Sequence, residues 1–319
     1  MESLVTDMSQ SLFFKIIDEC NKKCSFCPYT NDNKEAQMSF EVFKGLVARV
    51  RTNSNLMLFG GEPTLHPEFL VFVEHLLASN KRTNFSTNLL CDINILKEAC
   101  ALAEKYKGRL RVMINAQELD PKYEEQFLAN LDFLSKVKRS NKFDFDVKSN
   151  FVIDLAKTPE ENKREVDVLY KLFGNKIDML NMAPRIGNTK IIGRADTAKE
   201  ILEVVKYARE KFKDSYLTHE LYPCNFNNKE ERDEYSKYVA VMHYLLGCCG
   251  ISLLIDEKYL HTCIYGDPEM RLDHRKYTFL EDAYDDLDKI RAERVKTTMP
   301  NECKTCKLEC KKMICNKIF

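Results

Sequence analysis

Short apolar runs alternate with amphipathic helical patterns between residues 12 and 212, and this alternation constrains the fold more than any other feature. Apolar runs of this length predict buried strands, while apolar residues that recur every three or four positions predict helices. Alternation of the two is typical of a parallel sheet built from βα units. The predicted strands are 12–17, 56–59, 83–85, 110–114, 145–153 and 177–181. The predicted helices are 39–51, with Ser39 as N-cap, 67–79, 93–105, 123–137, 159–173 and 197–212.

Six βα units predict an α/β fold, a partial (β/α)6 barrel that stays open. The cysteines are unevenly placed, because eight of the 13 lie between Cys224 and Cys315. We therefore expect the barrel in residues 1–214 and a small C-terminal cysteine-rich domain in residues 215–319. This boundary depends on cysteine density alone, since no Pro-rich or Ser-rich linker marks it.

Overall composition narrows the class of protein. The 49 basic and 49 acidic residues cancel, so the chain has no net charge to favour nucleic acid or an anionic membrane. No apolar run approaches the roughly 20 residues that span a bilayer, and residues 1–10 lack the pattern of a secretion signal. We expect a cytoplasmic protein, in which so many cysteines indicate metal or redox chemistry rather than disulfides.

Three cysteines follow the first predicted strand within one short loop. Cys20, Cys24 and Cys27 are close enough in sequence to bind three irons of a cubane cluster, which leaves the fourth iron without a protein ligand. An open iron can bind a substrate or cofactor, much as catalytic zinc keeps a vacant position. A zinc site is the alternative, but it would need a fourth ligand that the loop does not contain.

Polar residues follow the next strands as well. Gly60-Gly61-Glu62-Pro63 comes after the second strand and Ser86-Thr87-Asn88 after the third. Working residues in such folds lie at the carboxyl ends of the strands, so these loops are expected to meet the cysteine loop at one mouth. Ordinary turns are the alternative. Further polar residues at strands four to six need partners, which could be a ligand or neighbouring side chains: Asn115, Gln117, Lys148, Asn150, Asn181 and Arg185.

The spacing Cys-x3-Cys-x2-Cys, with Phe26 before the last cysteine, resembles the radical S-adenosylmethionine (SAM) superfamily. This resemblance implies a [4Fe-4S] cluster on the three cysteines and SAM on its open iron. An electron from the reduced cluster then cleaves SAM to methionine and a 5′-deoxyadenosyl radical, which abstracts a substrate hydrogen atom. The glycine turn is similar to the family's Gly-Gly-Glu loop, which binds the SAM ammonium group, and the third-strand segment to one that faces SAM. The implied cofactor-binding residues are Phe26, Gly60, Gly61, Glu62, Ser86 and Asn88, with Lys148 and Asn150 as further candidates.

The C-terminal cysteines resemble the SPASM extension or its shorter form, twitch, which bind one or two auxiliary [4Fe-4S] clusters. A predicted hairpin at 251–260 lies between Cys249 and Cys263, a helical stretch follows, and Cys303-Lys-Thr-Cys306 opens a tight knuckle. Lys258 replaces the glycine of relatives, and the last spacings differ, so the number of clusters stays open. One arrangement has Cys248 or Cys249 with Cys263 and Cys315 in one site and Cys303, Cys306 and Cys310 in another. The other has Cys249, Cys263, Cys303 and Cys306 in a single cluster, and a zinc ribbon is the alternative to both.

Cys224 lies outside both cysteine patterns. Enzymes of this extended family can use a free cysteine as hydrogen donor to a substrate radical, so Cys224 is the catalytic candidate and whichever of Cys248 and Cys249 binds no cluster is its rival. A buried structural thiol is the alternative reading, since free cysteine behaves as a small hydrophobe. Cys91 and Cys100 fit that second description and are assigned no role.

The resemblance implies a radical SAM enzyme of oxidoreductase or epimerase type. Maturation of a ribosomally made peptide, by crosslinking or epimerisation, is the first expectation. Oxidation or epimerisation of a small molecule, such as a sugar or aminoglycoside precursor, is the alternative, and a non-catalytic iron–sulfur electron carrier is a second one. Only nineteen residues precede Cys20, so we expect no leader-binding domain there. A low-potential electron donor such as flavodoxin or ferredoxin is the implied partner.

Overall fold

The fold is a long curved sheet with helices on its outer side. The computed structural model describes residues 11–27, 37–51, 54–185, 196–218, 221, 225–239, 252–261 and 271–298. Within these residues one sheet has the order β10-β9-β8-β1-β2-β3-β4-β5-β6-β7. Its strands are β1 (Ser11–Ile17), β2 (Asn55–Gly60), β3 (Arg82–Thr87), β4 (Leu110–Ile114), β5 (Phe145–Ile153), β6 (Met179–Pro184), β7 (Ser215–Leu217), β8 (Ser252–Ile255), β9 (Tyr259–His261) and β10 (Leu272–Asp273).

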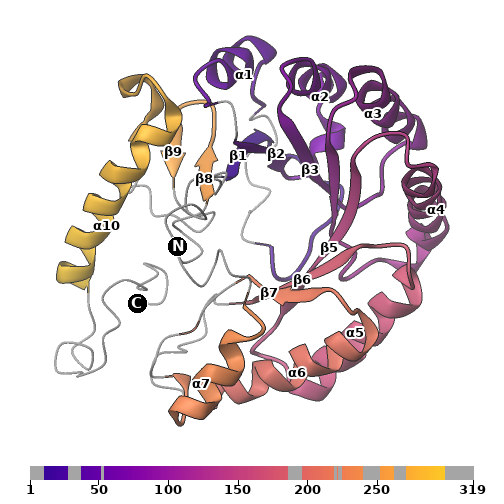
Figure 1. Ribbon diagram of the computed structural model, residues 1–319, viewed down its shortest axis with the longest axis vertical. Coiled ribbons are helices and arrows are strands. Elements are labelled where there is room, and N and C mark those ends of the chain that lie inside the picture. Colours follow the sequence, from indigo (N-terminus) through magenta and orange to yellow (C-terminus); the bar gives the residue numbers. More distant parts are fainter. Residues whose placement is uncertain are drawn as a thin grey trace.

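The helices follow the strands in chain order. They are α1 (Phe40–Val47), α2 (Phe69–Ala78), α3 (Ile93–Tyr106), α4 (Glu124–Ser140), α5 (Pro159–Phe173), α6 (Thr197–Lys211), α7 (Lys229–Ser236) and α10 (Ala283–Thr298). Figure 1 shows α1 to α6 side by side along the outside of the arc of strands. All neighbouring strands from β1 to β7 are parallel, so their carboxyl ends lie at one edge of the sheet.

The six predicted strands and six predicted helices are present, and their ends differ from expectation by at most four residues. The largest difference is at α1, which ends at Val47 rather than at residue 51. The chain there tightens into turns in which Arg49 N donates to Leu46 O and Val50 N donates to Val47 O. Ser39 is the predicted N-cap of this helix, and its hydroxyl accepts from Val42 N.

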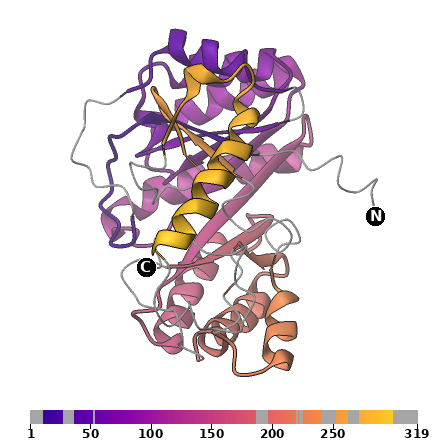
Figure 2. The same cartoon turned by 90° about the vertical axis from the view of Figure 1, so that its left-hand side faces the viewer.

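Two strands beyond the expected six extend the parallel sheet. The short strand β7 pairs with β6, and β8 pairs with β1 in parallel. The predicted hairpin is present as β8 and β9, which pair antiparallel, and it continues the barrel sheet. Figure 2 views this side of the molecule and shows α10 in front of the sheet. No helix of the described residues is long and apolar enough to span a bilayer.

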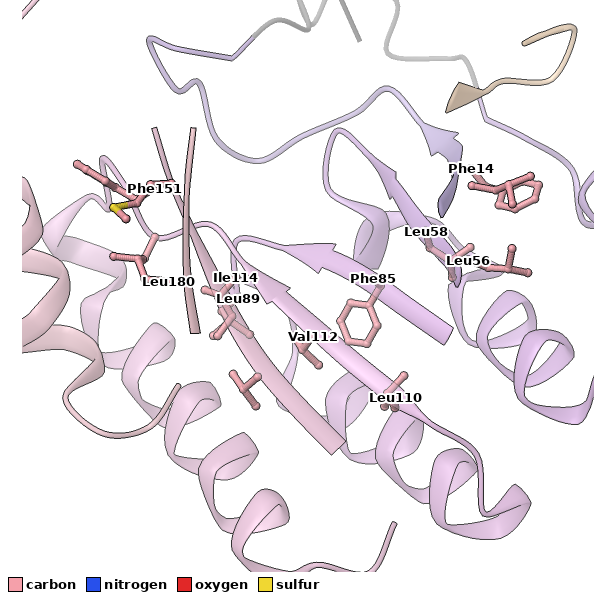
Figure 3. Packing of buried hydrophobic residues seen from close by; sticks show 14 of the residues in the cluster. Phe14, Leu56, Leu58, Phe85, Leu89, Leu110, Val112, Ile114, Phe151 and Leu180 are labelled. Atoms are coloured by element: carbon pink, nitrogen blue, oxygen red, sulfur yellow. The ribbon is translucent and has the colours of Figure 1, made fainter. Parts of the chain in front are cut away.

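The two faces of the sheet differ because side chains alternate along each strand. Figure 3 shows the outer face, where Phe14, Leu58, Phe85 and other buried residues form the core beneath the helices. Ring centroids lie 5.2 Å apart for Phe14 and Phe43 of α1 and for Phe85 and Phe69 of α2. The inner face carries half-buried polar residues instead, among them Lys15, Ser86, Arg111, Lys148, Asn150 and Asn181.

Candidate functional site

The cysteine loop, residues 18–27, begins where β1 ends and lies against the glycine turn after β2. Gly61 N donates to Ile17 O at 2.8 Å, and Glu62 N donates to Glu19 O at 2.8 Å. A Cβ added to Gly60 would lie 2.0 Å from Ile17 O, and one added to Gly61 would lie 2.0 Å from Glu19 O. Both contacts are with backbone, so the two loops pack this closely only because these residues have no side chains.

Glu62 joins the glycine turn to the end of β3. Its side chain is only 1% exposed. One carboxylate oxygen accepts from the Thr64 hydroxyl at 2.7 Å, and the other accepts from Asn88 N at 2.7 Å. Burial raises the pKa of this carboxyl group, while the hydrogen bonds from Thr64, Asn88 and Thr87 oppose the rise. The loops after β2 and β3 are therefore held together by one buried acidic side chain.

Asn88 extends this connection to the cysteine loop. Its side-chain amide donates to Asn21 Oδ1 at 2.6 Å and contacts Cys20 Sγ at 3.9 Å. Asn21 in turn donates to Leu90 O at 3.2 Å. Ser86 lies on the inner face of β3, two residues before Asn88, and is half-buried. The structure thus brings together the loops after β1, β2 and β3, as the order of the strands predicts.

The thiols of Cys20 and Cys24 have perturbed pKa values in this loop. Burial raises the pKa of the Cys20 thiol to about 11, and negative charge on Glu62, Cys24 and Cys27 adds to the rise. Burial also raises the pKa of Cys24, while the Lys22 ammonium lowers it. Cys27 is exposed. Free thiols at Cys20 and Cys24 are consequently protonated at neutral pH, so metal binding there must displace protons.

The inner face of β4 to β6 carries a cluster of charged and amide side chains. Asp146 accepts from Arg109 at 3.0 Å and from Arg111 at 2.9 Å. Lys148 has no carboxylate of the described residues within ion-pair distance, and its Nζ lies 3.6 Å from Met179 Sδ. Burial lowers the pKa of this lysine, and the charge of Arg111 lowers it further.

Three asparagines continue this inner face towards the carboxyl ends of the strands. The Asn181 amide contacts Asn150 Oδ1 at 3.4 Å, and Asn115 Oδ1 is buried without a hydrogen-bond partner among the described residues. Buried polar atoms normally have hydrogen-bond partners. The side-chain oxygen of Asn115 could therefore accept a hydrogen bond from a ligand on this face.

A protein-family model matches half of this chain. The family model of the Radical SAM superfamily matches residues 14–173, from within β1 to the end of α5. This chain belongs to the radical SAM superfamily. A search of curated proteins gave no match.

Two solved structures are similar to this chain along most of its length. The Streptococcus suis SuiB bound to S-adenosylmethionine has a TM-score of 0.65 and 17% identity, and the match covers 94% of this chain and 71% of that one. The same protein bound to its precursor peptide SuiA has a TM-score of 0.63 and 16% identity, with coverages of 96% and 72%. At this identity the likeness shows a shared fold.

Radical SAM proteins use a [4Fe-4S] cluster and SAM, and the donor set of this loop fits such a cluster. Thiolates are the usual ligands of iron–sulfur clusters, and three of them in one loop suit a cubane with one open iron. No three His, Cys, Asp or Glu side chains of the described residues converge on a single metal ion. A cubane does not need such convergence, because each thiolate binds a different iron.

Several residues of this radical SAM chain have contacts that the sequence did not suggest. Gln117 was a candidate to face a ligand, but its side chain is 5% exposed and bonds the backbone of Val152. Asn21, Ser25 and Glu118 contact other loops of the site and were not singled out. A polar loop residue gives no signal in one sequence that distinguishes a structural contact from simple exposure to water.

The other predicted cysteines divide into two groups. Cys91 and Cys100 are buried in the core at 3% and 6% exposure, and burial raises the pKa of each to about 12. The predicted auxiliary-cluster and hydrogen-donor cysteines lie outside the described residues: Cys224, Cys248, Cys249, Cys263, Cys303, Cys306, Cys310 and Cys315.

Proposed function

We propose that this chain is a radical SAM enzyme that modifies a ribosomally made peptide, with its [4Fe-4S] cluster held by Cys20, Cys24 and Cys27. One observation carries the proposal. The three thiols lie in a single loop that packs against Gly60 and Gly61, at the carboxyl edge of a parallel sheet. This is the edge at which α/β folds bind their ligands.

The residues around the loop have distinct roles in this proposal. When bound, the cluster and SAM supply a 5′-deoxyadenosyl radical that takes a hydrogen atom from the substrate. Gly60 and Gly61 allow the backbone of the turn to approach the cysteine loop and SAM. Glu62 fixes the turn and favours the SAM ammonium group by its negative charge. The other SAM-binding residues in the proposal are Phe26, Ser86 and Asn88.

The inner face of the sheet is the proposed place for the remaining polar groups of SAM and for the substrate. Lys148 offers a positive charge with no carboxylate of the described residues in ion-pair contact, so it suits an anionic group of either molecule. Asn150 and Asn181 offer amide donors and acceptors beside it. In the sheet register Lys148 is level with Met113 and Ser86, two residues before Asn88.

The peptide substrate is supported by the structural similarity to SuiB, which has been solved with its precursor peptide SuiA. Crosslinking or epimerisation is the proposed reaction. The C-terminal cysteines are proposed to bind one or two auxiliary clusters, and Cys224 to donate a hydrogen atom. Both of these roles are inferred from the sequence pattern alone.

Iron content tests the cluster assignment. The Cys20→Ala, Cys24→Ala, Cys27→Ala triple variant and wild type are reconstituted anaerobically, and bound iron and sulfide are measured. We expect the variant to lose roughly four irons per chain, because a cubane contains that number. Cys100→Ala is the matched control, since that thiol is buried in the core, and it should retain them. Equal iron in the triple variant and wild type would exclude a cluster at this loop.

Mass spectrometry tests the peptide proposal. The candidate substrate is any short peptide encoded beside the gene, and it is incubated with reduced enzyme and SAM. A crosslink removes two hydrogen atoms from the peptide, whereas epimerisation in heavy water adds one deuterium in place of hydrogen. An unchanged peptide, together with 5′-deoxyadenosine formation stimulated by a small molecule, would contradict peptide maturation.

A further inference from the structure

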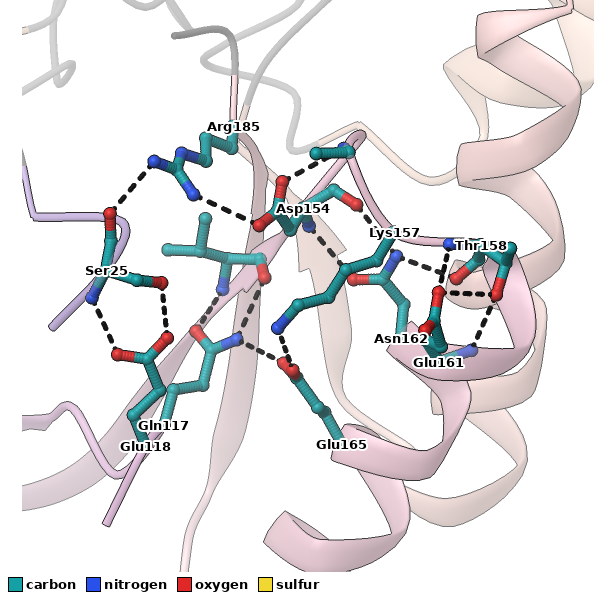
Figure 4. Close-up of polar contacts among 12 residues, drawn as sticks. Ser25, Gln117, Glu118, Asp154, Lys157, Thr158, Glu161, Asn162, Glu165 and Arg185 are labelled. Carbon is teal, nitrogen blue, oxygen red and sulfur yellow. Dashed lines mark hydrogen bonds and ion pairs between the residues drawn. The ribbon is translucent and has the colours of Figure 1, made fainter. Parts of the chain in front are cut away.

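We propose that Glu118 and Arg185 are positioning residues that hold the second half of the cysteine loop in its metal-binding shape before a cluster binds. That the loop binds an iron–sulfur cluster rests on the proposed function, whereas the contacts of Glu118 and Arg185 with the loop do not depend on it. Figure 4 shows both residues reaching Ser25, which lies between Cys24 and Cys27. Glu118 follows β4 and Arg185 follows β6, so the loop after β1 is held from across the sheet.

Glu118 binds Ser25 through both oxygens of its carboxylate. Ser25 N donates to Oε2 at 2.7 Å, and the Ser25 hydroxyl donates to Oε1. Hydrogen bonds to an ionised acceptor are roughly twice as strong as neutral ones. The backbone of Glu118 has φ 54°, a left-handed conformation that is uncommon for residues other than glycine. A strained backbone of this kind persists where the surrounding contacts require it, and here it presents the carboxylate to the loop.

Arg185 holds the other backbone group of the same residue. Its guanidinium donates to Ser25 O at 2.9 Å and to Asp154 Oδ2 at 3.1 Å, while Arg185 N donates to Ile153 O at 2.7 Å. The N–H and the C=O of Ser25 are therefore both bound to groups outside the loop. The peptide groups on both sides of Ser25 are each held by one hydrogen bond, so the positions of the flanking cysteines are restricted.

These two residues are themselves attached to buried anchors. Asp154 is 8% exposed, and its backbone N–H and C=O bond the Asn162 side chain at 2.9 and 3.0 Å. Gln117, next to Glu118, bonds Val152 N at 2.6 Å, and its own carbonyl accepts from Lys22 Nζ at 2.7 Å. The loop contacts thus lead into β5 and α5 and not to solvent-exposed ends.

A fixed loop favours cluster retention because the entropy of bringing the thiols together is lost before binding. The network of Ser25, Glu118 and Arg185 fixes the second half of the loop in this way. It is distinct from the contact of Asn88 with Asn21 and Cys20, which holds the first half of the loop.

The first experiment uses the whole chain without iron. Hydrogen exchange of peptides covering residues 20–27 is compared for wild type, Glu118→Ala, Glu118→Gln and Arg185→Lys. We expect about tenfold faster exchange at Ser25 for Glu118→Ala, since charge-assisted hydrogen bonds are lost. Glu118→Gln should lie between it and wild type, because an amide can still accept from Ser25 N but carries no charge. Thr158→Ala is the control, since it removes the α5 cap in the same region without contact to the loop.

The second experiment measures the rate of iron loss from reconstituted protein to a chelator. Glu118→Ala and Arg185→Lys should lose iron about tenfold faster than wild type, with unchanged melting temperatures, whereas Thr158→Ala should melt earlier but retain iron. Wild-type exchange and iron loss in the Glu118 and Arg185 variants would overturn the proposal, as would equal acceleration in Thr158→Ala. If the wild type binds a cluster but makes no 5′-deoxyadenosine, the proposed function fails while the positioning role stands.

Discussion

Replacing Gly61 by alanine tests the packing that places the cysteine loop. The new Cβ would lie 2.0 Å from Glu19 O, 2.4 Å from Glu19 C and 2.6 Å from Asp18 O. These are backbone atoms, so the turn and the loop must separate. Separation weakens the hydrogen bonds Gly61 N to Ile17 O and Glu62 N to Glu19 O, both 2.8 Å long.

Overpacking of this kind costs about 1–3 kcal/mol, and each hydrogen bond contributes about 1 kcal/mol. We therefore expect Gly61→Ala to lower the free energy of unfolding by about 3–5 kcal/mol if both bonds are lost, and by about 2–4 kcal/mol if one survives. The assay is urea denaturation followed by circular dichroism, with the midpoint as the primary quantity.

Gly45 gives the matched control. It is an exposed glycine within α1, and a Cβ added there meets no atom within 4 Å. Alanine is favoured over glycine in a helix by roughly 0.5–1 kcal/mol, so Gly45→Ala should stabilise the protein. A Gly61→Ala variant as stable as wild type, or a Gly45→Ala variant that loses equal stability, would refute the close approach of the two loops.

Three further outcomes are expected. Lys148→Met should stabilise the protein at neutral pH, because a lysine whose folded pKa is lowered destabilises the fold while it is charged. That penalty is complete below the folded pKa and disappears as pH rises towards the unfolded value of 10.5, so the stability difference from wild type should shrink between pH 7 and 10.5; a constant difference would contradict the shift. Thr158→Ala removes the capping box of α5 and should cost about 1 kcal/mol in urea denaturation, and no loss would argue against the cap. Asn88→Ala should weaken SAM binding in calorimetry of the reconstituted enzyme more than Asn94→Ala, an exposed helix residue, and equal affinities would remove Asn88 from the site.

Much of the barrel could be predicted because its signals are local. Strands 110–114 and 145–153 and helix 159–173 coincide with β4, β5 and α5. An apolar run marks β4, alternating burial is found along β5, and a Thr-Pro start marks α5. At β6 the predicted strand 177–181 began too early, because the Asp178 carboxylate accepts from Val147 N and the strand starts after it. A side chain that bonds the neighbouring strand leaves no mark in hydrophobic periodicity.

Pairing between distant segments could not be predicted. The hairpin at 251–260 was expected, but its parallel pairing with β1 depends on the position of the sheet's open edge. Likewise, three converging loops followed from strand order, whereas the contact of Gly61 with Glu19 and of Glu118 with Ser25 depends on how closely the loops approach. From the sequence, Gly60 and Gly61 were predicted to bind SAM. The structure shows that the close packing of the cysteine loop against the glycine turn also requires residues without side chains at these two positions.

The central claim is that Cys20, Cys24 and Cys27 form a radical SAM centre, and 5′-deoxyadenosine formation tests it most directly. Protein reconstituted with iron and sulfide is reduced anaerobically, supplied with SAM and candidate substrates, and the nucleoside is quantified for wild type, Cys24→Ala and Cys100→Ala. We expect formation by wild type and Cys100→Ala and none by Cys24→Ala. Equal formation by Cys24→Ala, or none by fully reconstituted wild type with any substrate, would contradict the assignment.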